Sequence, residues 1–184
     1  MIRDYNFQEQ LIMSTGISVD HNLTELLLNN IPGAIAIEKA QLADDRNGTD
    51  YWVYRDKNNP LSIDIKARNI DPISRYKQDD LALELISVVE NNKIGWTLDK
   101  YKQSDYILWL FKPTGRWVLI PFPMLCSVFI EHKELWTSLY RVERQSSDNG
   151  KWHSECVFVP RNVIWQSIYD RYSGSGKCEV NERK

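Results

Sequence analysis

The stretch from Leu61 to Arg68 alternates strictly between apolar and polar residues, and this alternation constrains the fold more than any other feature of the chain. The apolar residues hold the odd positions, whereas Ser62, Asp64, Lys66 and Arg68 hold the even ones. Successive side chains of a β-strand point to opposite faces of a sheet. The pattern therefore predicts a strand with one buried face, and it places Asp64 and Lys66 together on the other face.

The composition is that of a globular protein. Hydrophobic residues make up 42% of the 184 residues and charged residues 26%, which excludes wholesale disorder. We expect a single domain over 1–184, with a core over about 20–120, a C-terminal extension over 121–172 and a flexible tail over 173–184. The 23 basic and 25 acidic residues give no bulk attraction to nucleic acid or to an anionic membrane, which leaves a local basic face open.

The sequence favours a soluble, cytoplasmic protein. No window approaches the ~18 apolar residues of a membrane span. The first residues carry a charge of each sign and no apolar stretch, unlike a signal peptide. Three scattered cysteines, Cys126, Cys156 and Cys178, fit free thiols better than a disulfide framework. His153 and Cys156 have no second ligand pair nearby, so we do not expect a structural zinc.

The other segments predict a mixed α/β (α+β) fold in which helices flank a central mixed β-sheet. The polar turn at 44–48 separates the first strand from the next two, and 81–89 is a strand candidate for which a helix stays open. We expect helices over 4–14, from a cap at Asp20 or Asn22 to Ile31, over 121–139 and over 162–171, and strands over 34–38, 50–54, 61–68, 81–89, 105–111, 117–120 and 156–159.

Asp50, Asp64 and Lys66 are the candidates for chemistry. Asp50 begins the strand before the alternating one, and it approaches Asp64 if the two strands pair as a hairpin. Two carboxylates are hard oxygen ligands for Mg²⁺ or Mn²⁺, and the carbonyl of Ile65 is a further candidate ligand. A metal-activated water and a nearby ammonium group suit the hydrolysis of a phosphodiester.

Asp50, followed after thirteen residues by Asp64-Ile65-Lys66, resembles the signature of the PD-(D/E)XK (restriction-endonuclease-like) nuclease superfamily. The preceding helix and the three strands match the core order of that superfamily. Further residues resemble a small phage and bacterial branch of the superfamily, namely Asp45, Glu84 with Ser87, Gly95-Trp96 and Asp105-Tyr106. The likeness spans about residues 20–120.

The resemblance implies a Mg²⁺- or Mn²⁺-dependent endonuclease whose substrate is DNA, with RNA less favoured. It implies catalytic roles for Asp50, Asp64 and Lys66, and metal ligands from Asp50, Asp64 and Ile65. Asp45 and Glu84 would support the site. Many members act as dimers because two strands need two sites, so a homodimer is open here. The superfamily usually has a glutamate on its first helix, for which the candidates are Glu25, Glu9 and Glu38.

Simpler interpretations stay open beside these. Asp64 and Lys66 also fit a solvated strand face, and Trp96 fits a packing aromatic. The candidates for a track that contacts phosphates, or for a solvated face, are Lys66, Arg68, Arg75 and Lys77, with Lys100 and Lys102 later in the chain. The alternative function is a weak or inactive nuclease-fold module that binds nucleic acid or a protein partner, and a weaker one is a tryptophan-rich scaffold.

Overall fold

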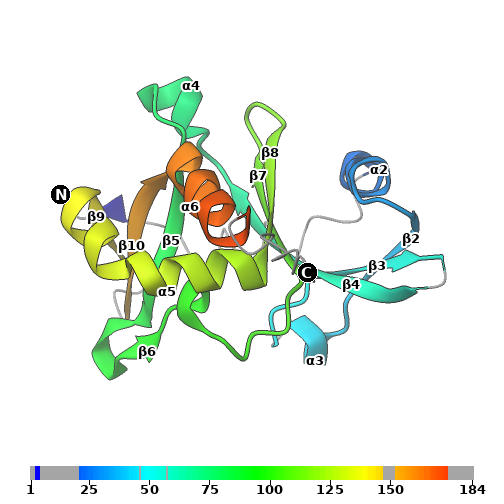
Figure 1. Ribbon diagram of the computed structural model, residues 1–184, viewed down its shortest axis with the longest axis horizontal. Coiled ribbons are helices and arrows are strands. Elements are labelled where there is room, and N and C mark those ends of the chain that lie inside the picture. Colours follow the sequence, from blue (N-terminus) through cyan, green and yellow to red (C-terminus); the bar gives the residue numbers. More distant parts are fainter. Residues whose placement is uncertain (1–2, 5–20, 46, 57, 147–151, 174–184) are drawn as a thin grey trace, which may run out of the picture.

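Two five-stranded sheets stand side by side in the computed structural model, which describes residues 3–4, 21–45, 47–56, 58–146 and 152–173 (Figure 1). The first sheet has the order β2-β3-β4-β7-β8 and the second has the order β1-β9-β10-β5-β6. The α+β class expected from the sequence is confirmed, and a second sheet accompanies the central sheet that was expected.

The first sheet is built around the alternating strand. Strands β2 to β4 form an antiparallel meander, β4 pairs in parallel with β7, and β7 and β8 form a hairpin. The bounds are β2 (Ala34–Lys39), β3 (Tyr51–Arg55), β4 (Asn58–Arg68), β7 (Tyr106–Phe111) and β8 (Arg116–Pro121). Helix α2 (His21–Asn30) covers one face, and it buries Leu23 and Leu27 against Ile63 and Ile65. The apolar half of the alternation therefore faces α2, as predicted.

The second sheet joins segments far apart in the sequence. Its central strand β10 (His153–Pro160) pairs antiparallel with β5 (Asp80–Val88) and with β9 (Val142–Ser146), and the edges are β1 (Arg3–Asp4) and β6 (Lys93–Ile94). Helices α5 (Phe122–Leu139) and α6 (Arg161–Ser173) cover one face. A second apolar cluster fills the space between these helices, β5 and β10, and the face of β7 and β8 turned away from α2.

Short elements complete the chain between the strands. They are the helices α3 (Leu42–Asp45) and α4 (Pro72–Tyr76) and the 3₁₀ turns η1 (Val89–Asn91) and η2 (Trp96–Leu98). Asp71 caps α4 because its side chain accepts the N–H of Ile73, and Pro72 follows in the first turn, where no N–H is missed. Within the described residues, no helix is both long and apolar enough to span a membrane.

Several expected elements differ from the structure. Asp4, expected at the start of a helix, lies in β1, where it pairs with Ser146, and residues 5–14 lie outside the described part. The turn expected at 44–48 is helical up to Asp45. The helical alternative for 81–89 is wrong, because β5 is fixed on both sides by β10 and β6. The other expected helices and strands are confirmed, with ends shifted by a few residues.

Candidate active site

A cleft of about 530 Å³ opens at the end of the first sheet where β3 begins. Residues on β4 and in the loops before β3 and β7 line it, together with part of β5, β6 and η2. The cleft therefore lies where the two sheets meet. Among its lining residues are the predicted Asp45, Asp50, Asp64, Ile65 and Lys66.

Asp50 lies immediately before β3 and reaches across to β4. Its backbone N–H donates to the carbonyl of Ile63 at 2.8 Å, and its Oδ2 accepts the N–H of Ile65 at 2.5 Å. Burial, and then the negative charge of the neighbouring Asp64, raise the pKa of Asp50 to about 7. Asp50 thus approaches Asp64, as the hairpin between their strands predicts.

Asp64 is buried, with 3% of its surface exposed, and two ammonium groups neutralise it. Its Oδ2 lies 2.8 Å from Nζ of Lys66 and 2.7 Å from Nζ of Lys102. These contacts are ion pairs rather than well-aligned hydrogen bonds. Burial alone would raise the pKa of Asp64, but the two lysines outweigh it and hold the pKa below its usual range.

Lys102 comes from the loop before β7 and was expected only among the candidates for phosphate contact. Its Nζ also donates to the carbonyl of Gly48 at 3.3 Å. Gly48 has a φ of +92°, and a Cβ there would lie 1.9 Å from Nζ of Lys102. The positive φ of this turn favours glycine before Thr49 and Asp50, and a larger residue would also force the Lys102 side chain to shift.

Lys66 rests on an aromatic ring that Glu84 holds in place. The Nζ of Lys66 lies 5.0 Å from the centre of the Trp96 ring. Oε2 of Glu84 accepts the N–H of Trp96 at 3.1 Å and the hydroxyl of Ser87 at 2.6 Å. Glu84 thus acts on Lys66 through Trp96, which also packs against the core. Gly95 allows this contact, because a Cβ there would lie 2.2 Å from the carbonyl oxygen of Glu84.

Two other predicted residues, Asp45 and Asp105, do not lie at the centre of the cleft. Asp45 is exposed at the rim of the cleft. Asp105 lies outside the cleft lining, where its Oδ2 accepts the backbone N–H of Ser62 at 2.8 Å and its hydroxyl at 3.0 Å. These bonds hold β4 against the start of β7, so Asp105 has a structural role.

Three basic residues expected in the phosphate track and the described candidates for the helix glutamate do not line the cleft. Arg68 lies four residues beyond Asp64 on β4, and Arg75 and Lys77 are exposed on and after α4, near the opposite end of the sheet (Figure 1). Glu25 on α2 is exposed, and Glu38 accepts the hydroxyl of Tyr54 at 2.8 Å. Glu9 lies outside the described residues.

A divalent cation fits the oxygen donors of this cleft. Magnesium commonly binds one or two carboxylates and keeps several waters, so Asp50 and Asp64 supply a sufficient set. Ile65 lies beyond the start of β3, and a strand residue directs its N–H and C=O to the same side. Asp50 takes the N–H, which leaves the carbonyl of Ile65 as a third oxygen. No cluster of three or more His, Cys, Asp or Glu side chains suited to a metal occurs among the described residues.

Comparison of the chain with models of known protein families, with curated proteins and with solved structures finds no match.

Proposed function

We propose that this chain is a metal-dependent nuclease that hydrolyses phosphodiester bonds of DNA. The observation that carries the proposal is the convergence of Asp50, Asp64 and Lys66 in one cleft, with Lys66 2.8 Å from Asp64. The order of α2, β2, β3 and β4 supports it, because it agrees with the core order of the superfamily that the sequence resembles.

The charges of the cleft suit a phosphate substrate in the presence of metal. Four aspartates and three lysines line the cleft, which gives a formal charge of −1. A bound divalent cation makes this charge +1, so metal binding favours the subsequent binding of a phosphodiester anion. The raised pKa of Asp50 fits the same site, since burial and then the charge of the neighbouring Asp64 favour its neutral form, and a bound cation would favour the ionised one.

The residues then have separate roles in hydrolysis. Asp50 and Asp64 would hold Mg²⁺ or Mn²⁺, which would supply an activated water and offset the charge that develops on the phosphate. Lys66 donates to the attacking water or to a phosphate oxygen, and the Trp96 ring keeps its ammonium group over the cleft. Lys102 keeps Asp64 ionised.

Incubation of the purified protein with plasmid and single-stranded DNA tests the proposal. Cleavage is expected with Mg²⁺ or Mn²⁺ and not with EDTA. Asp64→Asn and Lys66→Met should lower the rate at least about 100-fold, because each removes a group that acts on the transition state. Asp99→Asn and Lys93→Met are matched controls, since both side chains line the same cleft without contacting Asp64. Folded protein that cleaves neither substrate with either metal would contradict the proposal.

The second candidate is a nuclease-fold module that binds nucleic acid without cutting it. The contact of Lys102 with Asp64 favours it, because an ammonium group then occupies one carboxylate that a metal would need. This candidate predicts retention of DNA that EDTA does not change, and no cleavage.

A further inference from the structure

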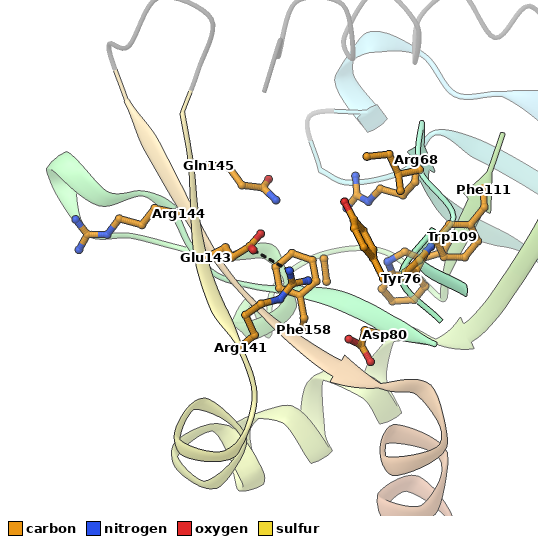
Figure 2. Close-up of a pocket in the computed structure, with 13 residues that line it drawn as sticks. Arg68, Tyr76, Asp80, Trp109, Phe111, Arg141, Glu143, Arg144, Gln145 and Phe158 are labelled. Carbon is orange, nitrogen blue, oxygen red and sulfur yellow. Dashed lines mark hydrogen bonds and ion pairs between the residues drawn. The ribbon is translucent and has the colours of Figure 1, made fainter. Parts of the chain in front are cut away.

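A second cavity lies near the opposite end of β4 from the cleft, between the two sheets (Figure 2). Strands β5, β9 and β10 form one side, and β4, β7 and α4 form the other. It shares no lining residue with the cleft. Arg68 lines this cavity, and it stands four residues along β4 from Asp64, which corresponds to about 13 Å.

Aromatic rings form the walls of this cavity. In Figure 2, Phe158 stands on one side and Tyr76 on the other, and Trp109 lies behind Tyr76. The guanidinium of Arg141 stacks on Phe158, with its centre 4.3 Å from the ring centre, and it also pairs with Glu143 at 2.8 Å. A flat ring whose edge enters the slot between Phe158 and Tyr76 gains aromatic contacts.

Two hydrogen-bond donors in this cavity have no partner among the residues that the structure describes. Nε1 of Trp109 has no hydrogen-bond partner among the described residues, although Trp109 is buried, with 1% of its surface exposed. The guanidinium of Arg68 makes no hydrogen bond or ion pair within the described part of the chain, whereas Arg144 is paired with Glu155. Both groups can only donate, so a ligand that satisfies them must bring acceptors and a negative charge.

An acceptor stands at the other end of the slot. Asp80 lies below the aromatic side chains in Figure 2, and Arg68 lies above them. Aspartate is a recognised partner of the exocyclic amino group of cytosine. The cavity is partly open to solvent, and its volume is about 80 Å³, which is smaller than the roughly 150 Å³ cavity that holds one benzene ring. One edge of a single ring can therefore enter, and a two-ring purine is disfavoured.

We propose that this cavity binds one cytosine nucleotide. One edge of the ring enters between Phe158 and Tyr76, its amino group donates to Asp80, and its carbonyl accepts the indole N–H of Trp109. The phosphate binds Arg68. The nucleotide is either free or an unpaired residue of a nucleic-acid strand, because both carry the same base and phosphate.

Calorimetric titration of the whole chain with CMP, AMP and ribose 5-phosphate, in EDTA, tests the site. CMP is expected to bind at least about tenfold more tightly than the other two, since AMP has a second ring and ribose 5-phosphate has no ring. Arg68→Gln should weaken CMP binding at least about tenfold, because it removes the charge that binds phosphate. Asp80→Asn should reduce the preference for CMP over UMP. Arg144→Gln is the control and should change the affinity less than about twofold.

Further results separate the two sources and the two sites. If a short single-stranded oligonucleotide containing cytosine displaces CMP, the ligand is a nucleotide within a strand, and if it does not, the ligand is a free nucleotide. The absence of CMP binding, equal binding of all three ligands or an unchanged affinity in Arg68→Gln would overturn the proposal. None of these results depends on cleavage or on metal, so the cavity and the proposed nuclease fail or stand independently.

Discussion

Nζ of Lys102 lies 2.7 Å from Oδ2 of Asp64, although 38 positions of the sequence separate the two residues. Lys66 lies two residues farther along β4, on the same face of the strand, and approaches the same oxygen. The buried carboxylate thus has one cation from its own strand and one from a distant loop. This arrangement keeps Asp64 ionised in a place where burial alone would favour its neutral form.

Replacement of Lys102 by methionine should destabilise the fold. Its side chain is 7% exposed, and its loss leaves a buried carboxylate with one cation in place of two. We expect the free energy of unfolding at pH 7 to fall by about 3 kcal/mol, measured by urea denaturation. Lys100→Met, at an exposed position of the same loop, should change it by less than about 0.5 kcal/mol. Equal effects of the two substitutions would show that the ion pair with Asp64 has no energetic importance.

Asp50 should make stability depend on pH. Its pKa of about 7 in the folded protein exceeds the ordinary 3.8, so the folded state holds a proton that the unfolded state releases. This contribution to stability is complete below about pH 4 and is lost as the pH rises through 7. The asparagine in the variant Asp50→Asn does not titrate, so the variant does not lose this stabilisation as the pH rises. The free energy of unfolding of the variant, relative to that of the wild type, should therefore increase by up to about 4 kcal/mol between pH 4 and 7.5. Urea denaturation in EDTA measures this, and parallel pH profiles would refute it.

Gly95 should tolerate no side chain. Its φ is −70°, which any residue adopts, so the requirement for glycine comes from the carbonyl of Glu84 at 2.2 Å from a would-be Cβ. We expect Gly95→Ala to lower the free energy of unfolding by about 3 kcal/mol. Gly33→Ala has free space around it but a φ of +75°, and should cost about 1 kcal/mol. Thermal denaturation of the two variants decides the order, and a smaller loss at Gly95 would show that the backbone moves aside easily.

Asp71 should stabilise the junction of α4 and β8. It is 3% exposed and accepts bonds from Arg116 and from the hydroxyl of Thr114 at 2.6 Å. The hydrogen bonds of Arg116 are the largest cause that lowers the pKa of Asp71, to about 2. Because this pKa is depressed, the stabilisation is present above about pH 4 and is lost as the pH falls through 2. Asp71→Asn should therefore cost about 2 kcal/mol at pH 7 and less at pH 3.

The comparison for this prediction is Asp79→Asn. Asp79 pairs with the same Arg116 at 2.9 Å, but 28% of its side chain is exposed. Its loss should be smaller than that of Asp71, because water replaces the missing bonds more readily. If the loss at Asp71 does not shrink at low pH, the carboxylate charge is not the source of the stability.

The parts of the fold that the sequence predicts are those with a local signal. Alternation in β4 predicts its buried face, and the apolar stretches 105–111 and 117–120 predict the strands that pair as β7 and β8. Strand β9 was missed because Val142 is its single apolar residue, so the segment shows no alternation of apolar and polar residues. The second sheet was missed for a related reason. Its β5 and β10 pair across about seventy residues, which no local pattern encodes.

The candidate site divides in the same way. The spacing of Asp64 and Lys66 on one strand, and the position of Asp50 at the start of another, predicts that these groups meet. Lys102 lies in a loop, where no periodicity indicates which way a side chain points. The sequence signal that agrees with the approach of Lys102 is the glycine at position 48, because a side chain there would collide with the side chain of Lys102. Arg68 lies outside the cleft because each further residue along a strand is about 3.3 Å farther from the site.

The rate of plasmid nicking as a function of Mg²⁺ concentration, for the wild type, Asp64→Asn and Asp99→Asn, tests the central claim most directly. The nuclease account predicts a rate that rises from zero and saturates with Mg²⁺ in the wild type and in Asp99→Asn, and that falls at least about 100-fold in Asp64→Asn. A rate that is the same in folded Asp64→Asn as in the wild type, or that does not depend on the metal, would contradict it.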